Sequence, residues 1–156
     1  MKRFNISSFL LCLVLLAIVA IPNKVKAQKD GSDKPEFIKK YEVMPWELLK
    51  DEKFKEAYLK ATEDFSNVAW LRELKVAAPP NKVINVDGKL YVYMEFCKIH
   101  NCGDDMVYLL YDPEQNRVFG TYIKKIDGKK REILIGEPSE EELNLLYRII
   151  DRMELK

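Results

Sequence analysis

Two cysteines flank the only histidine of the chain in the segment FCKIHNC, residues 96–102. Cys97, His100 and Cys102 could serve three kinds of chemistry at this spacing. They could bind a metal ion, form a redox-active thiol pair, or close a small loop through a disulfide. The neighbouring elements and the compartment of the protein bear on which of these applies.

The metal and redox interpretations both lack a partner that they need. Structural zinc takes four ligands, and here the fourth could only be a carboxylate such as Asp104 or Asp105. A reactive thiol pair is usually spaced by two residues at a helix N-terminus, whereas four residues separate Cys97 from Cys102. We therefore predict no metal and no cofactor.

The first 27 residues have the layout of a secretory signal peptide. Lys2 and Arg3 precede an apolar run from Phe9 to Ile21, and the segment ends in the small-residue motif VKA at residues 25–27. The run is shorter than the about 20 residues of a membrane-spanning helix, so cleavage is favoured over an anchor. We expect a periplasmic or secreted protein with no membrane segment after cleavage.

Cleavage after Ala27 changes the charge and the cysteine count. Four of the 26 basic residues and no acidic residue are removed, which leaves 22 basic and 25 acidic residues and a formal charge of −3. This mild acidity gives no support for nucleic-acid binding, which needs a basic footprint. Cys97 and Cys102 are the two cysteines that remain, and an even number in an exported chain favours a disulfide.

A disulfide here would close a ring of about six residues and remove roughly 2 kcal/mol of unfolded-chain entropy. A loop already held in shape also loses less entropy when it binds a partner. A stapled surface turn without any target explains the same residues equally well.

The remaining 129 residues suit one domain. Residues 28–50 are expected to form a flexible lead-in with a short helical turn at Met44–Lys50, and residues 51–156 a single domain.

Two helices are predicted in this domain: one starts near Asp51, and a closing helix has a Ser139–Glu142 capping box. Their apolar stripes comprise Phe54, Ala57, Tyr58, Ala61 and Phe65 in the first helix, and Leu143, Leu146, Tyr147, Ile150 and Met153 in the second. The segment 68–74 carries Trp70, which is expected in the core.

Five strands are predicted between these helices, at residues 82–86, 89–97, 106–111, 117–125 and 131–136. Asp87-Gly88 and Asp127-Gly128 are strong hairpin turns, and short turns impose antiparallel pairing. The predicted fold class is therefore α+β, an antiparallel sheet of about five strands flanked by helices. The loop 97–102 would project from the end of a hairpin.

The loop and its surroundings resemble the inhibitor of vertebrate lysozyme (Ivy) family. That family's loop reads Cys-Lys-Pro-His-Asp-Cys followed by Gly, and this chain has CKIHNCG at residues 97–103. Ile99 stands at the position of the family's Pro, and Asn101 at that of its Asp. VAW around Trp70, VINVDGKLYVYMEFC and MVYLLYDPEQNRVFGTYIKK are also similar, so the likeness runs from about Phe54 to Lys130.

The resemblance implies an inhibitor of c-type lysozyme that protects peptidoglycan, and not an enzyme. Lys98, Ile99, His100 and Asn101 would form the inhibitory loop, with Cys97 and Cys102 as its staple. His100 would bond to the two catalytic carboxylates in the lysozyme cleft, with Lys98 as a nearby contact.

The neighbours Asp104 and Asp105, the most obvious carboxylate pair, are expected to form a solvated turn with no catalytic role.

An alternative is a non-inhibitory envelope module that binds another protein or assembles, for example as a homodimer. Exposed tyrosines at alternating strand positions, Tyr91, Tyr93 and Tyr108, would suit such an interface, although they are more often ordinary sheet residues.

Overall fold

The computed structural model describes residues 36–154. The predicted signal peptide, residues 1–27, and the first part of the lead-in lie outside the described residues. Every helix within residues 36–154 is too short or too polar for a membrane span.

The sheet has six antiparallel strands. They are β1 (Val76–Ala77), β2 (Lys82–Val86), β3 (Lys89–Lys98), β4 (Asp105–Asp112), β5 (Arg117–Ile126) and β6 (Lys129–Ile135). The order is β1-β3-β4-β5-β6, and β2 also pairs with β3. The five predicted strands are confirmed, and β1 is additional because two residues carry no alternating pattern.

Strand β3 is long enough to serve two partners along one edge. Its first half pairs with β2, from Lys89 opposite Val86 to Tyr93 opposite Lys82. Its last two residues pair with β1, where Ala77 lies opposite Cys97. The end of β3 that leads into the loop is therefore held between β1 and β4.

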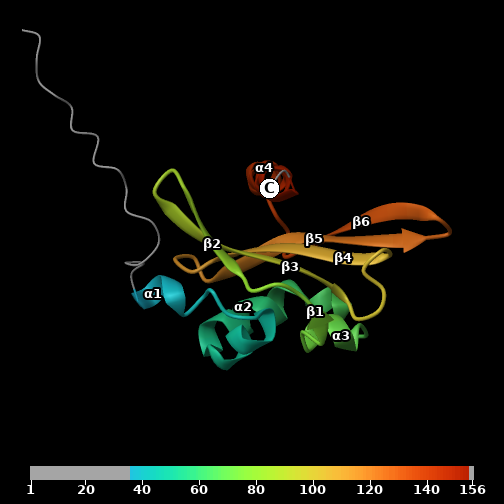
Figure 1. The fold of residues 1–156 in the computed structure, drawn as a ribbon, viewed down its shortest axis with the longest axis horizontal. Coiled ribbons are helices and arrows are strands. Elements are labelled where there is room, and N and C mark those ends of the chain that lie inside the picture. Colours follow the sequence, from blue (N-terminus) through green and yellow to red (C-terminus); the bar gives the residue numbers. More distant parts are fainter. Residues whose placement is uncertain (1–35, 155–156) are drawn as a thin grey trace, which may run out of the picture. The chain divides into compact units, whose positions relative to one another are not determined.

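Helices cover both faces of the sheet (Figure 1). The N-terminal elements lie on one face, and α4 (Glu140–Glu154) lies on the other. The N-terminal set comprises α1 (Glu36–Lys39), η2 (Pro45–Lys50), α2 (Glu52–Ala61), η3 (Glu63–Phe65) and α3 (Ala69–Arg72). This arrangement confirms the predicted α+β class.

Side-chain caps start the two longer helices. The Asp51 carboxylate accepts hydrogen bonds from the backbone N–H groups of Lys53 and Phe54 at 3.0 and 3.1 Å. At α4, Ser139 N–H donates to the Glu142 carboxylate at 2.7 Å, and Glu142 N–H donates to Ser139 Oγ at 3.3 Å. The predicted capping box is confirmed.

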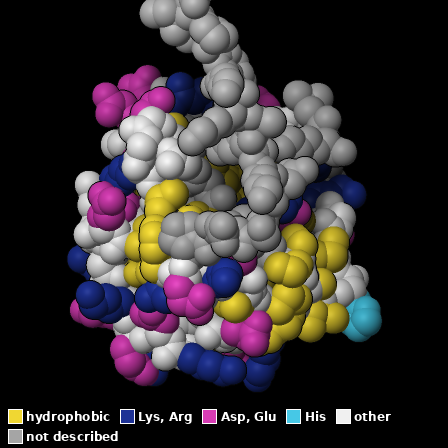
Figure 2. Space-filling model, turned by 60° about the vertical axis from the view of Figure 1, so that its left-hand side comes forward, with side chains coloured by type: hydrophobic (Ala, Val, Ile, Leu, Met, Phe, Trp, Pro, Cys, Tyr) yellow, Lys and Arg dark blue, Asp and Glu magenta, His cyan; other side chains and the backbone are white. Residues whose placement is uncertain are grey.

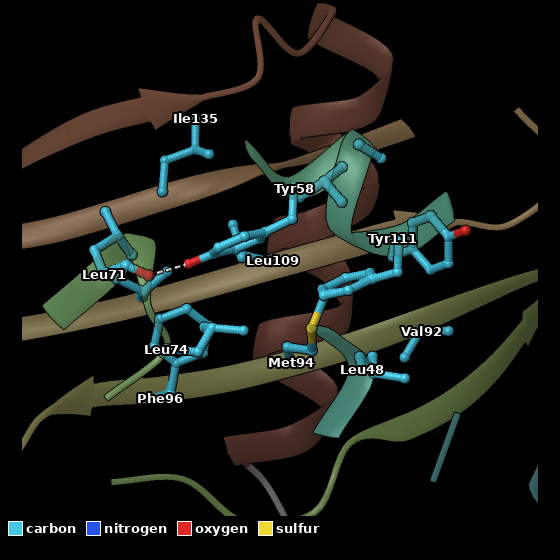
Figure 3. Close-up of a cluster of buried hydrophobic side chains, with 14 of the residues drawn as sticks. Leu48, Tyr58, Leu71, Leu74, Val92, Met94, Phe96, Leu109, Tyr111 and Ile135 are labelled. Atoms are coloured by element: carbon cyan, nitrogen blue, oxygen red, sulfur yellow. Dashed lines mark hydrogen bonds between the residues drawn. The ribbon is translucent and has the colours of Figure 1, made fainter. Parts of the chain in front are cut away.

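Strand residues alternate between two apolar clusters, one on each face of the sheet. The larger cluster lies under the N-terminal helices and includes Phe54, Tyr58, Met94, Leu109 and Tyr111 (Figure 3). The Tyr58 hydroxyl in this cluster donates a hydrogen bond to the Leu71 carbonyl oxygen. Under α4 the cluster comprises Tyr91, Tyr93, Leu110, Phe119, Leu145, Leu146 and Ile149.

Two predictions about this second cluster were wrong in part. Leu146 is buried as predicted, and Ile150 and Met153 are half-buried against the cluster. Leu145 and Ile149 are buried beside Leu146, whereas Tyr147 is 37% exposed and donates a hydrogen bond to Glu132 instead of filling the core. Tyr91 and Tyr93 are also buried because α4 covers their face of the sheet, and Tyr108 is half-buried against the same cluster. These tyrosines therefore do not form an exposed interface.

Candidate functional site

The connection between β3 and β4 carries the predicted site. Cys97 lies within β3, opposite Ala77 of β1 and Met106 of β4. Cys102 lies in the turn, with its Cα 4.9 Å from that of Cys97, and the two sulfurs are bonded. The predicted disulfide is confirmed, and both sulfurs are therefore unavailable as metal thiolates.

A tight turn forms the tip of this loop. The backbone N–H of Asn101 donates to the Lys98 carbonyl oxygen at 2.9 Å, which closes a four-residue turn over residues 98–101. His100 is the third residue of the turn and has a φ of 65°. A positive φ at that position characterises a type II turn, and histidine is among the non-glycine residues that adopt this region more often than most.

The tip of the loop is open to solvent. Lys98, Ile99 and His100 are exposed, with 47% of Ile99 accessible. Figure 2 shows the histidine protruding at the margin of the surface beside a group of apolar side chains. Among residues 36–154, no group forms a hydrogen bond or ion pair with the His100 imidazole. Its two nitrogens are therefore free to meet a partner.

Asn101 differs from its neighbours because its side chain turns inward. The Asn101 amide nitrogen donates to one oxygen of Asp105, and the Tyr122 hydroxyl donates to the other oxygen. Asp105 is only 6% exposed. Burial, together with this hydrogen bond to Asp105, raises the pKa of Tyr122 well above its usual range.

The interpretation of Asp104 and Asp105 as a solvated turn was wrong for Asp105. Asp104 is half-exposed and forms an ion pair with Lys125 at 3.4 Å, but Asp105 begins β4 and faces the core. The alternation of Asp105 with Val107 and Leu109 along the strand was the sequence signal for its inward orientation. Tyr122 carried no comparable signal.

A hollow of about 240 Å³ adjoins the loop on the side of β5. Its lining includes Cys102, Asp104, Tyr108, Lys125 and Lys130. Within residues 36–154, no group of three or more His, Cys, Asp or Glu side chains is arranged to hold a metal ion. The site is thus a projecting, cross-linked loop with one exposed imidazole.

Comparison with known proteins identifies the family of this chain. A comparison with curated protein sequences finds no match. The sequence model of the family described as "Inhibitor of vertebrate lysozyme (Ivy)" matches residues 53–140. This match covers more than half of the chain, from α2 through the whole sheet, and includes the disulfide-closed loop. The chain therefore belongs to the inhibitor of vertebrate lysozyme family.

Proposed function

We propose that this protein inhibits a c-type lysozyme by inserting the loop 97–102 into the enzyme's cleft. In this proposal His100 bonds to the two catalytic carboxylates, and Lys98 and Ile99 contact the walls of the cleft. The observation that carries the proposal is the exposed, unpartnered His100 at the tip of a disulfide-closed turn. Family membership supports lysozyme as the target.

The chemistry of the two partners is complementary. Lysozyme holds one carboxylic acid and one carboxylate on either side of the scissile bond, and hydrolysis of the glycosidic bond needs both groups. An imidazole can donate from one ring nitrogen and either donate or accept at the other, depending on protonation. One side chain of His100 would thus occupy both catalytic groups and exclude the substrate, without any reaction of its own.

The shape and charge of the chain favour such a complex. The disulfide and the turn hydrogen bond hold the tip in place before binding, so less entropy is lost on association. After removal of residues 1–27 the formal charge would be −3, which would steer the protein toward a cationic enzyme.

Export completes the proposal. Residues 1–27 would act as a signal peptide, residues 28–50 as a lead-in and residues 51–156 as the inhibitory domain, which would reach the periplasm or the medium. There the loop could oxidise and meet lysozyme. The alternative of a non-inhibitory binding module loses its supporting feature, because Tyr91 and Tyr93 are buried.

A cell-wall lysis assay tests the proposal. The oxidised mature protein, Gln28 to Lys156, should stop lysis by a c-type lysozyme, and His100→Asn should weaken inhibition at least about tenfold. Asparagine is a better replacement than alanine because it tolerates the positive φ of this position. Asp87→Asn, the same kind of change at another positive-φ turn, is the control and should inhibit normally. Equal inhibition by wild type and His100→Asn would refute the role of His100.

A further inference from the structure

We propose that Asp105 and Tyr122 are positioning residues of the inhibitory loop, and that Asn101 is its internal anchor, not a contact with the target. This inference rests on the proposed function of the loop. It assigns roles to two residues outside the segment 97–102 and reverses the role expected for Asn101 from the sequence.

Asn101 is the point at which the hydrogen bonds of the loop converge. Its N–H closes the turn with Lys98, and its carbonyl oxygen accepts from the N–H groups of Asp104 and Asp105 at 3.1 and 3.0 Å. Its side-chain amide donates to the Asp105 carboxylate. Both the outgoing turn that carries His100 and the return to β4 are thus fixed through one residue.

The Asp105 carboxylate has a second donor that ties the loop to the body of the domain. The Tyr122 hydroxyl bonds to it from β5. The Tyr122 ring meets the rings of Trp70 and Phe65 edge-on, with centroids 5.8 and 6.0 Å apart. The chain of contacts therefore runs from α3 and η3, through Tyr122 and Asp105, to Asn101 at the base of the turn.

The contact with the Asp105 carboxylate requires a hydrogen-bond donor at position 101. An ionised carboxylate only accepts hydrogen bonds, so a partner of Asp105 must be a donor. The amide of Asn101 supplies an N–H, whereas an aspartate at this position would bring a second acceptor and a second negative charge against Asp105. The neutral amide is what allows the inward orientation while His100 points outward.

Hydrogen exchange of the free protein, combined with lysozyme binding, tests the assignment. The reporters are the amides of Asn101, Asp104 and Asp105, since each donates within the loop. Asn101→Asp should accelerate their exchange and weaken binding about tenfold or more. The double variant Asn101→Asp with Asp105→Asn restores an amide opposite a carboxylate, so it should recover slow exchange and most of the affinity.

A matched control and a milder variant keep the test decisive. Asp104→Asn removes a carboxylate next to Asp105 that faces Lys125 on the outside, and it should leave the three reporter amides protected. Tyr122→Phe removes only the hydroxyl and keeps the aromatic contacts, so it should speed exchange of the same amides to a smaller extent. Thermal unfolding identifies any variant that has lost its fold as a whole.

The outcomes separate this inference from the proposed function. The positioning role would be overturned if the reporter amides exchange at the wild-type rate in both Asn101→Asp and Tyr122→Phe. It would also be overturned if the losses of protection and affinity in the double variant are the sum of those in the single variants. Either result would count even if the wild type inhibits lysozyme. If the wild type fails to inhibit lysozyme but the double variant recovers slow amide exchange, the proposed target is refuted. The role of Asn101 as the anchor of the loop then still holds.

Discussion

Ala77 of β1 lies opposite Cys97 of β3, so the first cysteine of the loop is fixed in the sheet before the chain turns. Cys102, in contrast, is exposed in the turn. The disulfide therefore ties the exposed turn of the loop to a strand that is already held in the sheet. Its main effect should fall on the loop and not on the sheet.

Removing the disulfide should therefore reduce lysozyme inhibition strongly, while the domain still folds. Without the cross-link, a Cys97→Ala, Cys102→Ser variant has a more flexible unfolded chain, and its free energy of unfolding should fall by about 2 kcal/mol. Alanine keeps an apolar side chain at the buried position 97. Urea unfolding should show this loss in a single transition, and the lysis assay should show reduced inhibition. Wild-type inhibition by this variant would show that the hydrogen bonds alone hold the loop.

Replacing Ile99 by proline should strengthen binding. Ile99 is the second residue of the turn, a position that proline favours, and Lys98 before it is in a strand, as a residue preceding proline prefers. The expected gain in affinity is about two- to fivefold, because the loop of the free protein then has fewer conformations to lose on binding. Ile99→Ala separates this effect from loss of the exposed side chain, and a weaker complex for Ile99→Pro would contradict the type II turn.

Lysozyme binding should take up protons as the pH falls from 8 to 6. In the proposed complex two flanking carboxylates would favour the imidazolium form of His100, so the complex would bind more protons than the separate proteins and affinity would rise toward lower pH. Calorimetry in two buffers of different ionisation enthalpy measures the proton uptake directly. His100→Asn should show little uptake; a constant affinity for the wild type across this range would argue against contact with carboxylates.

Gly120→Ala should be strongly destabilising. A methyl group at Gly120 would collide with the Tyr108 carbonyl oxygen and lie 2.9 Å from Leu109 Cα, both on the neighbouring strand β4. Since backbone must shift to admit it, we expect a loss of about 3 kcal/mol or more in the free energy of unfolding. Gly103→Ala, with nothing within 4 Å of the added group, is the control and should unfold at nearly the wild-type denaturant concentration.

Stability should fall as the pH rises above about 10. Burial, followed by the nearby Tyr41 and Asp51, raises the pKa of Tyr111 to about 12. A free tyrosine titrates near 10, so between about pH 10 and 12 the folded chain binds more protons than the unfolded chain, and raising the pH favours unfolding. Urea midpoints at pH 9, 10 and 11 measure this decline, which should be shallower in Tyr111→Phe.

The sequence was sufficient for the strands but not for the face of α4. Strands β2 to β6 carry clear alternation or turns that define their ends. In α4, apolar residues occupy positions 143, 145, 146, 147, 149 and 150, so several stripes fit the helical period equally well. Only the packing against Tyr91, Tyr93 and Phe119 selects Leu145 and Ile149 over Tyr147.

The candidate site was likewise predictable only in part. Cys97, His100 and Cys102 stand out because these residue types are rare in the chain. The contact of Asp105 with Tyr122 depends on the register of β4 against β5, in which Val107 lies opposite Tyr122 and Asp105 is its diagonal neighbour. No local pattern encodes that pairing, so the support beneath the loop became visible only in three dimensions.

The order of the strands has a consequence for how the protein matures. From β2 to β6 each strand pairs with the next one in the chain, so most sheet contacts are local and each closes only a short loop. The β3–β4 hairpin brings Cys97 and Cys102 together as it forms, and residues 28–156 contain no other cysteine with which either could mispair. Formation of this disulfide should therefore need an oxidant but no disulfide isomerase.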